Sequence, residues 1–234
     1  MKDYFIHLAT VLISGRFNTL QQRSDERGIN MIAIIDYDAG NLKSVEKALQ
    51  HLGEEVVITR DHDEIKKADK VILPGVGAFG DAMQKLHHYQ LVDTIKEVVA
   101  KNTPLLGICL GLQLLFERSE ETEGVEGLSI LKGNIVRIPD KEGLKIPHIG
   151  WNSLRFTKDS RLFKGLDQDA YVYFVHSYYL HAANAQDVAA TTEYSTTLDV
   201  AVEKDNVYAC QFHPEKSGDV GLAILKNFAN IGKE

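Results

Sequence analysis

Apolar and polar residues from position 31 onward alternate between the spacing of short strands and the spacing of amphipathic helices. Residues 31–36 form a short apolar run that predicts a strand, and residues 41–52 carry apolar side chains at helical spacing. Asn41 is placed to cap this helix, and Gly53 follows its end. The same spacing predicts strands at residues 55–59, 70–73 and 105–108, a helical stretch after the glycines near residue 77, and helices at residues 91–100 and 110–117.

The second half of the chain has a different pattern. After about residue 124 the spacing predicts strands at residues 134–138, 148–156 and 171–180, a hairpin over residues 198–212 that turns at Asp205 and Asn206, and a last helix over about residues 217–231. Alternating strands and helices in the first half favour a parallel sheet covered on both faces. We therefore expect a three-layer, flavodoxin-like α/β fold with a mostly parallel sheet, helices on both faces and an added antiparallel β section.

Residues 1–30 differ from the rest of the chain, because a mixed apolar stretch is followed by a polar one. Lys2 before apolar residues is compatible with a signal peptide, but Asp3 and His7 interrupt the pattern and no A-x-A cleavage site follows. We interpret residues 1–30 as an N-terminal appendage outside the core, and residues 31–234 as the domain.

Composition narrows the possible functions. Only two cysteines occur in 234 residues, and their spacing matches no zinc pattern, which indicates a reducing compartment and no metal site. The net charge is -7, and acidic and basic residues are interspersed, so no basic stripe is present to bind nucleic acid. No apolar run approaches the roughly 20 residues that cross a bilayer. We expect a cytoplasmic protein that binds neither nucleic acid nor membrane.

Cys109 lies between two glycines, in Gly107-Ile-Cys109-Leu-Gly111, where an apolar strand is expected to meet a helix. This is the arrangement of a nucleophile elbow, although a lone buried cysteine more often serves packing alone. The helix dipole supplies roughly 0.3–1 kcal/mol, less than one pKa unit. Since an ordinary thiol has a pKa of about 8.5, a nucleophilic Cys109 needs a basic partner.

His213 is the best candidate for that partner, because Pro214 favours an extended backbone before it and residues i and i+2 of an extended chain share a face. Glu215 would then lie beside His213 and orient its imidazole, as in catalytic triads. A strand end with a salt bridge is the simpler alternative. Most of the other histidines, His7, His51, His62, His87, His88, His148 and His181, should be solvated, whereas His176 lies in an apolar strand and Cys210 is expected in the core.

The segment from Gly75 to Gly80 fits the G-x-G-x-x-G pattern of dinucleotide sites. However, it follows the third expected strand rather than the first, and no acidic residue ends the next strand as that fingerprint requires. An oxyanion hole is the better interpretation, with backbone donors from Gly75, Val76 and Gly77 and the N–H of Leu110. Glycines also allow a peptide to flip, so this loop could become competent only when a partner binds.

Three segments occur in the order Pro74-Gly-Val-Gly77, Gly107-Ile-Cys109-Leu-Gly-Leu-Gln113 and His213-Pro-Glu215. In these the chain resembles the triad, or class I, glutamine amidotransferases. Additional segments make it most similar to the glutaminase subunits of imidazole glycerol phosphate synthases; these are Gly40-Asn-Leu42, Pro74-Gly-Val-Gly-Ala-Phe79, Leu114-Leu-Phe-Glu117 through Glu121, His148-Ile-Gly-Trp-Asn152, Val175-His-Ser-Tyr178 and Gln211-Phe-His-Pro-Glu-Lys216.

The resemblance implies a heterodimer in which this subunit hydrolyses L-glutamine and ammonia passes through a (β/α)8 barrel synthase subunit in histidine biosynthesis. It implies Cys109 as nucleophile, His213 as base and acid, and Glu215 as the residue that orients His213. The resemblance also implies that glutamine binds at Gln113, Glu121, Ser177 and Tyr178, and that the partner lies near Asn41, Trp151 and Lys216. It implies no cofactor. Free ammonia becomes ammonium in neutral water and loses its nucleophilicity, so a glutaminase that serves synthesis needs a closed route to its acceptor. The sequence shows no phosphate-binding loop that could hold such an acceptor, which favours a separate partner subunit.

Three alternatives remain open at this point. The chain could serve another synthase, such as pyridoxal phosphate synthase, with the same triad and a different acceptor. It could act alone as a cysteine hydrolase of γ-glutamyl substrates. It could also be a non-catalytic α/β interaction module that keeps the elbow.

Overall fold

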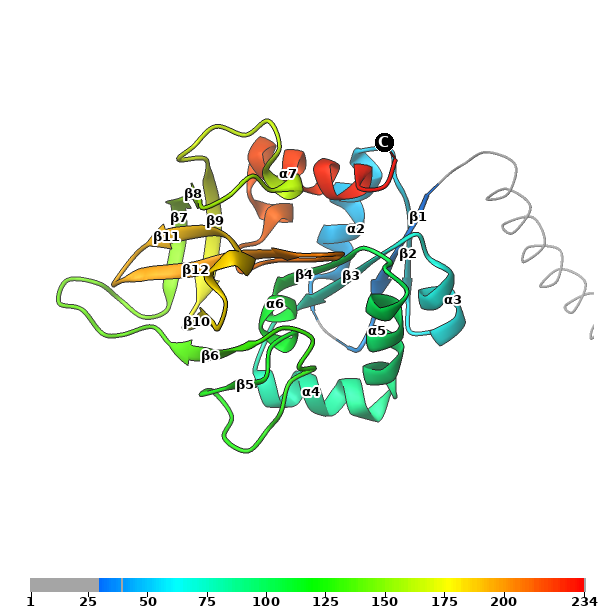
Figure 1. Ribbon diagram of the computed structural model, residues 1–234, viewed down its shortest axis with the longest axis horizontal. Helices are drawn as coiled ribbons and strands as arrows, with labels where there is room; N and C mark the ends of the chain where they lie inside the picture. Colours follow the sequence, from blue (N-terminus) through cyan, green and yellow to red (C-terminus); the bar gives the residue numbers. More distant parts are fainter. Residues whose placement is uncertain (1–29, 39, 234) are drawn as a thin grey trace, which may run out of the picture.

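A large mixed sheet runs through the computed structural model, which describes residues 30–38 and 40–233 (Figure 1). Its strands in spatial order are β2 (Glu55–Thr59), β1 (Met31–Ile35), β3 (Lys70–Gly75), β4 (Leu105–Cys109), β13 (Val207–Cys210), β12 (Thr197–Lys204), β10 (Tyr178–Ala182), β6 (Gly133–Arg137) and β5 (Arg118–Ser119), with β11 (Val188–Glu193) beside β12 and β8 (Arg155–Phe156) beside β11. The first five are parallel, and antiparallel pairing starts at β12. This order confirms the predicted flavodoxin-like sheet with an antiparallel extension.

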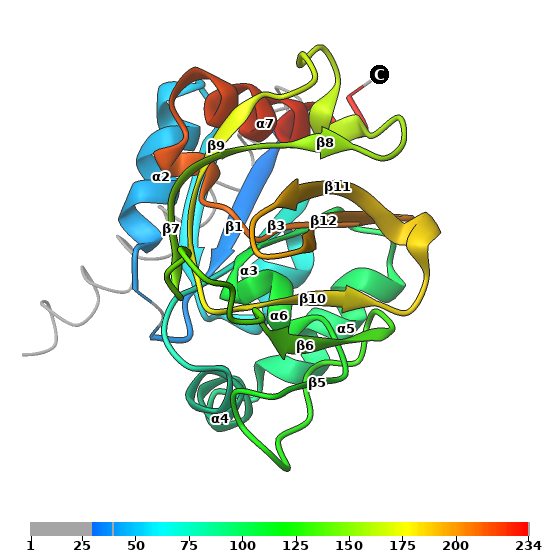
Figure 2. The same cartoon turned by 90° about the vertical axis from the view of Figure 1, so that its left-hand side faces the viewer.

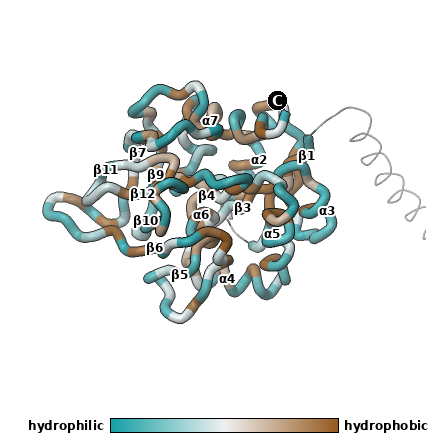
Figure 3. Tube along the Cα trace, in the orientation of Figure 1, coloured by the Kyte–Doolittle hydropathy of each residue, from teal (hydrophilic) through white to brown (hydrophobic). Residues whose placement is uncertain are grey.

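Helices cover both faces of the parallel strands (Figure 1). They are α2 (Leu42–His51) and α7 (Gly218–Asn230) on one face, and α3 (His62–Lys67), α4 (Phe79–His88), α5 (Leu91–Ala100) and α6 (Leu110–Leu114) on the other. Along β1, Ile32 and Ile34 pack in the core under α2 and α7, while Ala33 and Ile35 pack in the core under the other four helices. The apolar segments accordingly gather at the centre of the domain (Figure 3).

A second, two-stranded antiparallel sheet joins β7 (His148–Ser153) to β9 (Tyr171–His176), with His148 opposite His176 (Figure 2). Three short 3-10 helices complete the described elements: η1 (Arg161–Phe163), η2 (Ala185–Asp187) and η3 (Pro214–Lys216). The backbone N–H of His213, just before η3, donates to the carbonyl of Tyr173 in β9 at 3.0 Å. The small sheet is thus fastened directly to the segment that carries His213.

Several element boundaries differ from the prediction. The helix expected at residues 110–117 ends at Leu114, because the carbonyls of Leu114 and Leu115 accept N–H groups of Leu128 and Ile130 at 2.8 and 2.9 Å. The strands expected at residues 148–156 and 171–180 are each divided, at Leu154 and at Ser177. The elements α3, β5 and β11 were not predicted.

The carboxyl ends of the parallel strands lie at one edge of the sheet, where α/β folds place their ligands. Gly75 at the end of β3 is in register with Cys109 at the end of β4. Strand β13 ends two residues before Phe212, and His213 follows. The fold therefore brings the glycine loop, the elbow and the His-Pro-Glu segment to the same edge.

Candidate active site

Cys109 occupies a strained turn between β4 and α6, with φ 55° and ψ -112°. Such a conformation costs a residue other than glycine about 1–3 kcal/mol and occurs mainly at functional sites. The glycines on either side make the turn possible: a Cβ on Gly107 would lie 2.8 Å from the carbonyl oxygen of Gly111, and one on Gly111 would overlap the carbonyl of Leu73. The predicted elbow is therefore present, and its sulfur lies at the edge of the sheet.

His213 and Glu215 lie side by side, but the 3-10 helix η3 brings them together rather than the extended tripeptide that we expected. The Nδ1 atom of His213 is 2.8 Å from Oε1 of Glu215, and both side chains are almost completely buried. The backbone of His213 is extended, with φ -101° and ψ 96°, and the hydroxyl of Ser217 donates to its carbonyl at 2.6 Å. A buried carboxylate thus fixes the orientation of the imidazole and holds a proton on Nδ1.

The electrostatics of His213 favour an imidazolium beside Cys109. Burial alone would lower the pKa of His213, but its interactions with Cys109 and Glu215 outweigh burial and raise that pKa to about 9. Its Nε2 atom is buried and has no partner of ordinary hydrogen-bond geometry within residues 30–38 and 40–233, and the interaction of His213 with Cys109 leaves this atom for the thiol. Because α6 has only five residues, its dipole contributes little, and His213 is the main activating group.

Asn41 adds a third group to this pair. We expected it to cap α2, and it does stand at the N-cap position, but in the left-handed region (φ 71°) and without a side-chain bond to the helix. Its Nδ2 instead donates to Oε1 of Glu215 at 2.6 Å. The capping prediction was therefore right about the position and wrong about the side chain, which stabilises the carboxylate that orients His213.

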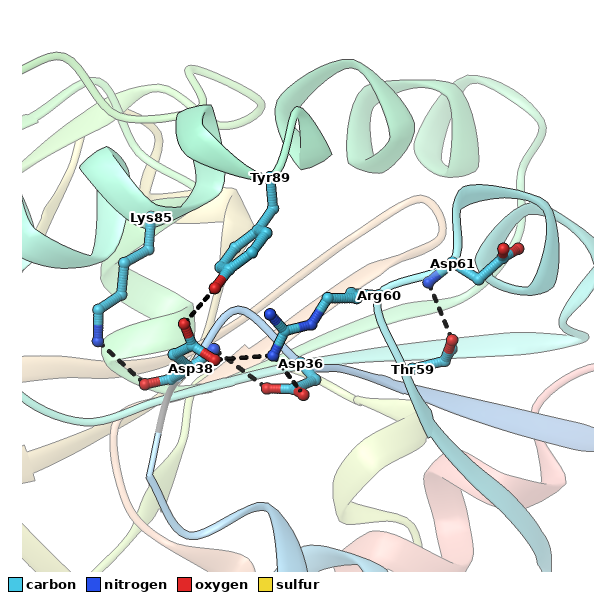
Figure 4. Close-up of polar contacts among 7 residues, drawn as sticks. All are labelled: Asp36, Asp38, Thr59, Arg60, Asp61, Lys85 and Tyr89. Carbon is cyan, nitrogen blue, oxygen red and sulfur yellow. Dashed lines mark hydrogen bonds and ion pairs between the residues drawn. The ribbon is translucent and has the colours of Figure 1, made fainter.

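A polar cluster anchors the segment that leads to Asn41 (Figure 4). Arg60, after β2, donates to Asp36 and to Asp38 at 2.7 Å each, and its guanidinium lies 4.2 Å from the centre of the Tyr89 ring. Tyr89 donates to Asp38, and Lys85 donates to the Asp38 carbonyl at 3.0 Å. Asp38 also has a positive φ of 61°. This cluster was not foreseen, because it joins residues of three separate elements.

The glycine loop lies directly beside the elbow. A Cβ on Gly75 would lie 3.0 Å from Cβ of Leu110, Gly77 has φ 96°, and Val76 is 41% exposed. Tyr37 donates to the carbonyl of Pro74 at 2.8 Å and so holds the start of the loop. A small cavity is enclosed by Gly40, Asn41, Val45, Pro74, Gly75, Val76, Ile108, His213 and Glu215. Of the predicted oxyanion donors, Gly75 and Leu110 thus lie against the elbow, and the roles of these donors stay a prediction.

The same loop does not suit a dinucleotide. In that use, the first N–H groups of the following helix bind a pyrophosphate. In α4, the N–H of Phe79 donates to Oε2 of Glu121 at 2.8 Å, and the N–H of Gly80 donates to the hydroxyl of Thr122 at 3.2 Å. Protein side chains thus already occupy the place that a phosphate would take.

The candidate glutamine ligands form two groups in the structure. Gln113 is buried in α6, and its Nε2 donates to the carbonyl of Tyr178 at 3.2 Å. Ser177 precedes Tyr178 at the break between β9 and β10, and its carbonyl accepts the N–H of Ile138 at 2.9 Å. Glu121 lies apart from these, bonded to the glycine loop at Phe79.

Gln211 was not predicted as a site residue, although it begins one of the segments on which the resemblance to the glutaminase subunits rests. It is fully buried, and its Nε2 is 3.8 Å from the sulfur of Cys109, within hydrogen-bonding range of sulfur. Its Oε1 accepts Nε2 of Gln113 at 2.9 Å.

An exposed aromatic surface lies next to the active-site segment. Trp151 is 55% exposed on β7, and its ring meets Tyr173 of β9 edge to face at 6.2 Å. Ile149 and Tyr171 are also exposed on the same two strands, and Lys216 is exposed in η3. Large exposed apolar side chains in a cluster are typical of a protein interface.

The remaining histidines and the second cysteine follow the prediction with one exception. His148 was grouped with solvated histidines but is 3% exposed, with its ring stacked on Tyr194 at 4.1 Å. Cys210 is fully buried, and burial raises the pKa of its thiol. His7 lies outside the described residues. Within residues 30–38 and 40–233, no group of His, Cys, Asp and Glu could hold a metal ion, and no helix is long and apolar enough to cross a membrane.

Comparison with known families assigns the chain to a class of proteins. The profile of the family described as "Glutamine amidotransferase class-I" matches residues 33–231. The chain therefore belongs to the class I glutamine amidotransferases, as its motifs indicated.

Curated relatives narrow the similarity further. The chain is 53% identical to the imidazole glycerol phosphate synthase subunit HisH of Caldanaerobacter subterraneus subsp. tengcongensis, over 87% of this chain and 99% of that protein. It is 49% identical to the protein of the same name from Methanocaldococcus jannaschii, over 86% and 100% of the two chains.

Solved structures support the fold. PurLQS from Thermotoga maritima aligns with a TM-score of 0.67 at 18% identity, over 86% of this chain and 98% of that one. The glutaminase domain of Trypanosoma brucei CTPS aligns with a TM-score of 0.61 at 18% identity, over 86% and 94%.

Proposed function

We propose that this chain is the glutaminase subunit of an imidazole glycerol phosphate synthase, which hydrolyses L-glutamine to glutamate and ammonia through a thioester at Cys109. The observation that carries the proposal is the elbow sulfur of Cys109 beside the buried His213–Glu215 pair. Relatives of about half identical sequence, matched over almost their whole length, bear the name of that synthase subunit.

In the proposed reaction, Nε2 of His213 takes the thiol proton, and the sulfur attacks the side-chain amide carbon of glutamine. The carbonyl oxygen becomes an oxyanion, for which the N–H of Leu110 and donors of the loop from Gly75 through Val76 to Gly77 are the candidate partners. His213 then returns its proton to the nitrogen, which leaves as ammonia. Water, activated by the same imidazole, attacks the thioester, releases glutamate and restores the thiol on Cys109.

Glu215 keeps the imidazole in one orientation throughout these steps and stabilises its protonated form. The raised pKa of His213 is consistent with this role, because an imidazolium is the state formed after each proton transfer from the thiol or water. Nε2 has no other partner among the described residues, so it is available to exchange a proton with the sulfur of Cys109.

Glutamine would be bound by Gln113, Glu121, Ser177 and Tyr178. Gln113 is bonded to Tyr178 at the start of β10, and Glu121 is bonded to Phe79 at the start of α4. Glu121 is well placed to link the substrate to the loop, since its carboxylate already holds the N–H of Phe79.

The partner would be a (β/α)8 barrel synthase subunit in a heterodimer, located in the cytoplasm. Ammonia loses its nucleophilicity when water protonates it, so a closed route to the acceptor has a chemical purpose. The barrel would then form imidazole glycerol phosphate and aminoimidazole carboxamide ribotide. The proposed docking region comprises the exposed Trp151 together with Lys216 and Asn41. Asn41 bonds Glu215, the residue that precedes Lys216.

The test is a Cys109→Ala variant, purified with the barrel subunit and assayed with either glutamine or free ammonia as nitrogen source. We expect glutamine-dependent synthesis to be lost and ammonia-dependent synthesis to be kept. Cys210→Ala is the matched control, because this second thiol is fully buried in the core. Retained glutamine hydrolysis in Cys109→Ala would refute the catalytic assignment, and failure of the wild-type chain to support the barrel would refute the assigned acceptor.

A further inference from the structure

Gln211 approaches the nucleophile from the strand next to the elbow. It follows β13, its backbone N–H donates to the carbonyl of Val200 at 2.8 Å, and its side chain is fully buried. Its neighbours in sequence, Cys210 and Phe212, pack into the core under α2 and α7. The side chain of Gln211 is thus directed at Cys109, with Nε2 3.8 Å from the sulfur.

The orientation of the Gln211 amide is determined by a backbone carbonyl. The carbonyl of Tyr178 can only accept, so the side-chain atom of Gln113 that lies 3.2 Å from it must be the amide nitrogen. That nitrogen has a second hydrogen, which it donates to Gln211 Oε1 at 2.9 Å. Reversing the Gln211 amide would place two NH2 groups against each other, so its own NH2 group must face the sulfur.

The Tyr178 carbonyl is itself fixed from the other side. Its second lone pair accepts Nδ1 of His176 at 2.8 Å. His176 is neutral, because burial lowers its pKa to about 3, so its Nε2 is an acceptor and receives Nδ1–H of His148 at 3.0 Å. The Tyr178 carbonyl therefore accepts from both sides, from His176 and from Gln113. Gln113 donates its second hydrogen to Gln211, which leaves the Gln211 NH2 group to donate to Cys109.

We propose that Gln211 is a further catalytic residue, whose side-chain N–H donates to the sulfur of Cys109 and stabilises its thiolate. The inference rests on the proposed function, since it concerns the same nucleophile. A thiolate accepts hydrogen bonds far better than a thiol does, so this N–H favours the charged form of the sulfur. His213 and Gln211 then act from two sides, one removing the proton and the other stabilising the charge that remains.

Titration of the sulfur reports this contact directly. The titratable groups that interact with the sulfur, among the described residues, are Tyr37, His213 and Cys210, and Glu215 acts through His213. None of these is bonded to the Gln211 amide, so a change confined to that amide can be separated from them.

The experiment measures the rate at which iodoacetamide alkylates Cys109 as a function of pH in the full-length chain. Gln211→Met removes the donor and keeps the length of the side chain, and we expect the pH midpoint to rise by about one unit. Gln211→Glu keeps an acceptor for Gln113 but sets a carboxylate beside the sulfur, and we expect a larger rise. In the complex, kcat with glutamine should fall about tenfold or more while KM stays within about twofold.

Gln50→Glu is the matched control, because it adds the same charge at an exposed position of α2. If Gln211 served packing alone, the variants would lose thermal stability but keep the wild-type midpoint, and that result in either folded variant would overturn the inference. Should both variants fail to fold, the side-chain amide protons of Gln211 in the wild type provide the same test by NMR. They should move downfield through the alkylation midpoint, and unmoved resonances would also overturn it. The proposed function would still stand in each case, because Cys109→Ala tests it separately.

Discussion

The buried pair His148 and His176 should make this protein lose stability on mild acidification. Burial lowers the pKa of His148 to about 4 and that of His176 to about 3, against about 6.5 for an unfolded histidine. The folded chain therefore binds fewer protons than the unfolded chain below that value. Stability that is present above about pH 6.5 must be lost as the pH falls toward the folded pKa values.

The magnitude follows from the protons that only the unfolded chain can bind. Between pH 7 and about pH 5, a histidine that stays neutral when folded gives up about 2 kcal/mol of unfolding free energy. Both imidazoles are almost fully buried by exposed area, but less protein surrounds His148 than His176, so we count the contribution of His148 at half weight. The pair should then account for about 3 kcal/mol over this interval.

The assay is urea unfolding of the full chain at several pH values, compared with a variant that lacks the titrating pair. His148→Asn with His176→Asn keeps an amide donor near each Nδ1 position and removes both titrations. His213 has its pKa raised by Cys109 and Glu215, so it acts in the opposite direction, but it does so equally in both proteins and cancels from the difference. His87→Asn, at an exposed position of α4, is the reference for losing a histidine.

We expect the double variant to be less stable than the wild type at neutral pH and to lose about 3 kcal/mol less on acidification. Equal pH slopes for the two proteins would show that the pair is protonated in the folded state. In that case the assigned direction of the His148 to His176 hydrogen bond would be wrong as well.

Two substitutions test the geometry around the elbow and the triad. Gly111→Ala would force a Cβ into the Leu73 carbonyl and should lower the free energy of unfolding in urea by about 3 kcal/mol or more. Gly143→Ala has open space around the new Cβ but φ 83°, and should lower it by about 1 kcal/mol. Equal losses in the two variants would contradict the steric account. Asn41→Gly keeps the left-handed backbone but removes the hydrogen bond to Glu215, and should lower kcat about tenfold in the complex at unchanged KM. Asn41→Asp places a second carboxylate beside Glu215 and should lower kcat further. Full activity in both variants would exclude a positioning role for Asn41.

Features that depend on neighbouring residues were predictable from the sequence. The elbow follows from glycines two residues before and after Cys109, because both are required by contacts within the turn or with the adjacent strand. The pairing of His213 with Glu215 was predicted from their spacing, although only His213 is extended and the 3-10 helix η3 carries Glu215. The alternation of strands and helices likewise predicted a parallel sheet covered on both faces.

Features that depend on distant partners were not predictable. α6 ends early because residues of a later loop take the carbonyls that a longer helix would use. His148 is buried because β7 pairs with β9 and brings it opposite His176. Asn41 bonds Glu215 rather than its own helix, and the two residues are 174 positions apart in the chain. Residue types alone do not specify these long-range pairings.

Gln211 lies between these two cases. Gln211 lies two residues before His213, the spacing at which side chains of an extended chain share a face, so the sequence allows both side chains to approach the same site. Its position was therefore within reach of the sequence. Its chemistry was not, because an amide can present either oxygen or nitrogen, and the choice is made by the carbonyl of Tyr178 through Gln113. The hydrogen bond to Cys109 is thus specified by the tertiary fold, and only a structure that places β10 beside α6 reveals a donor there.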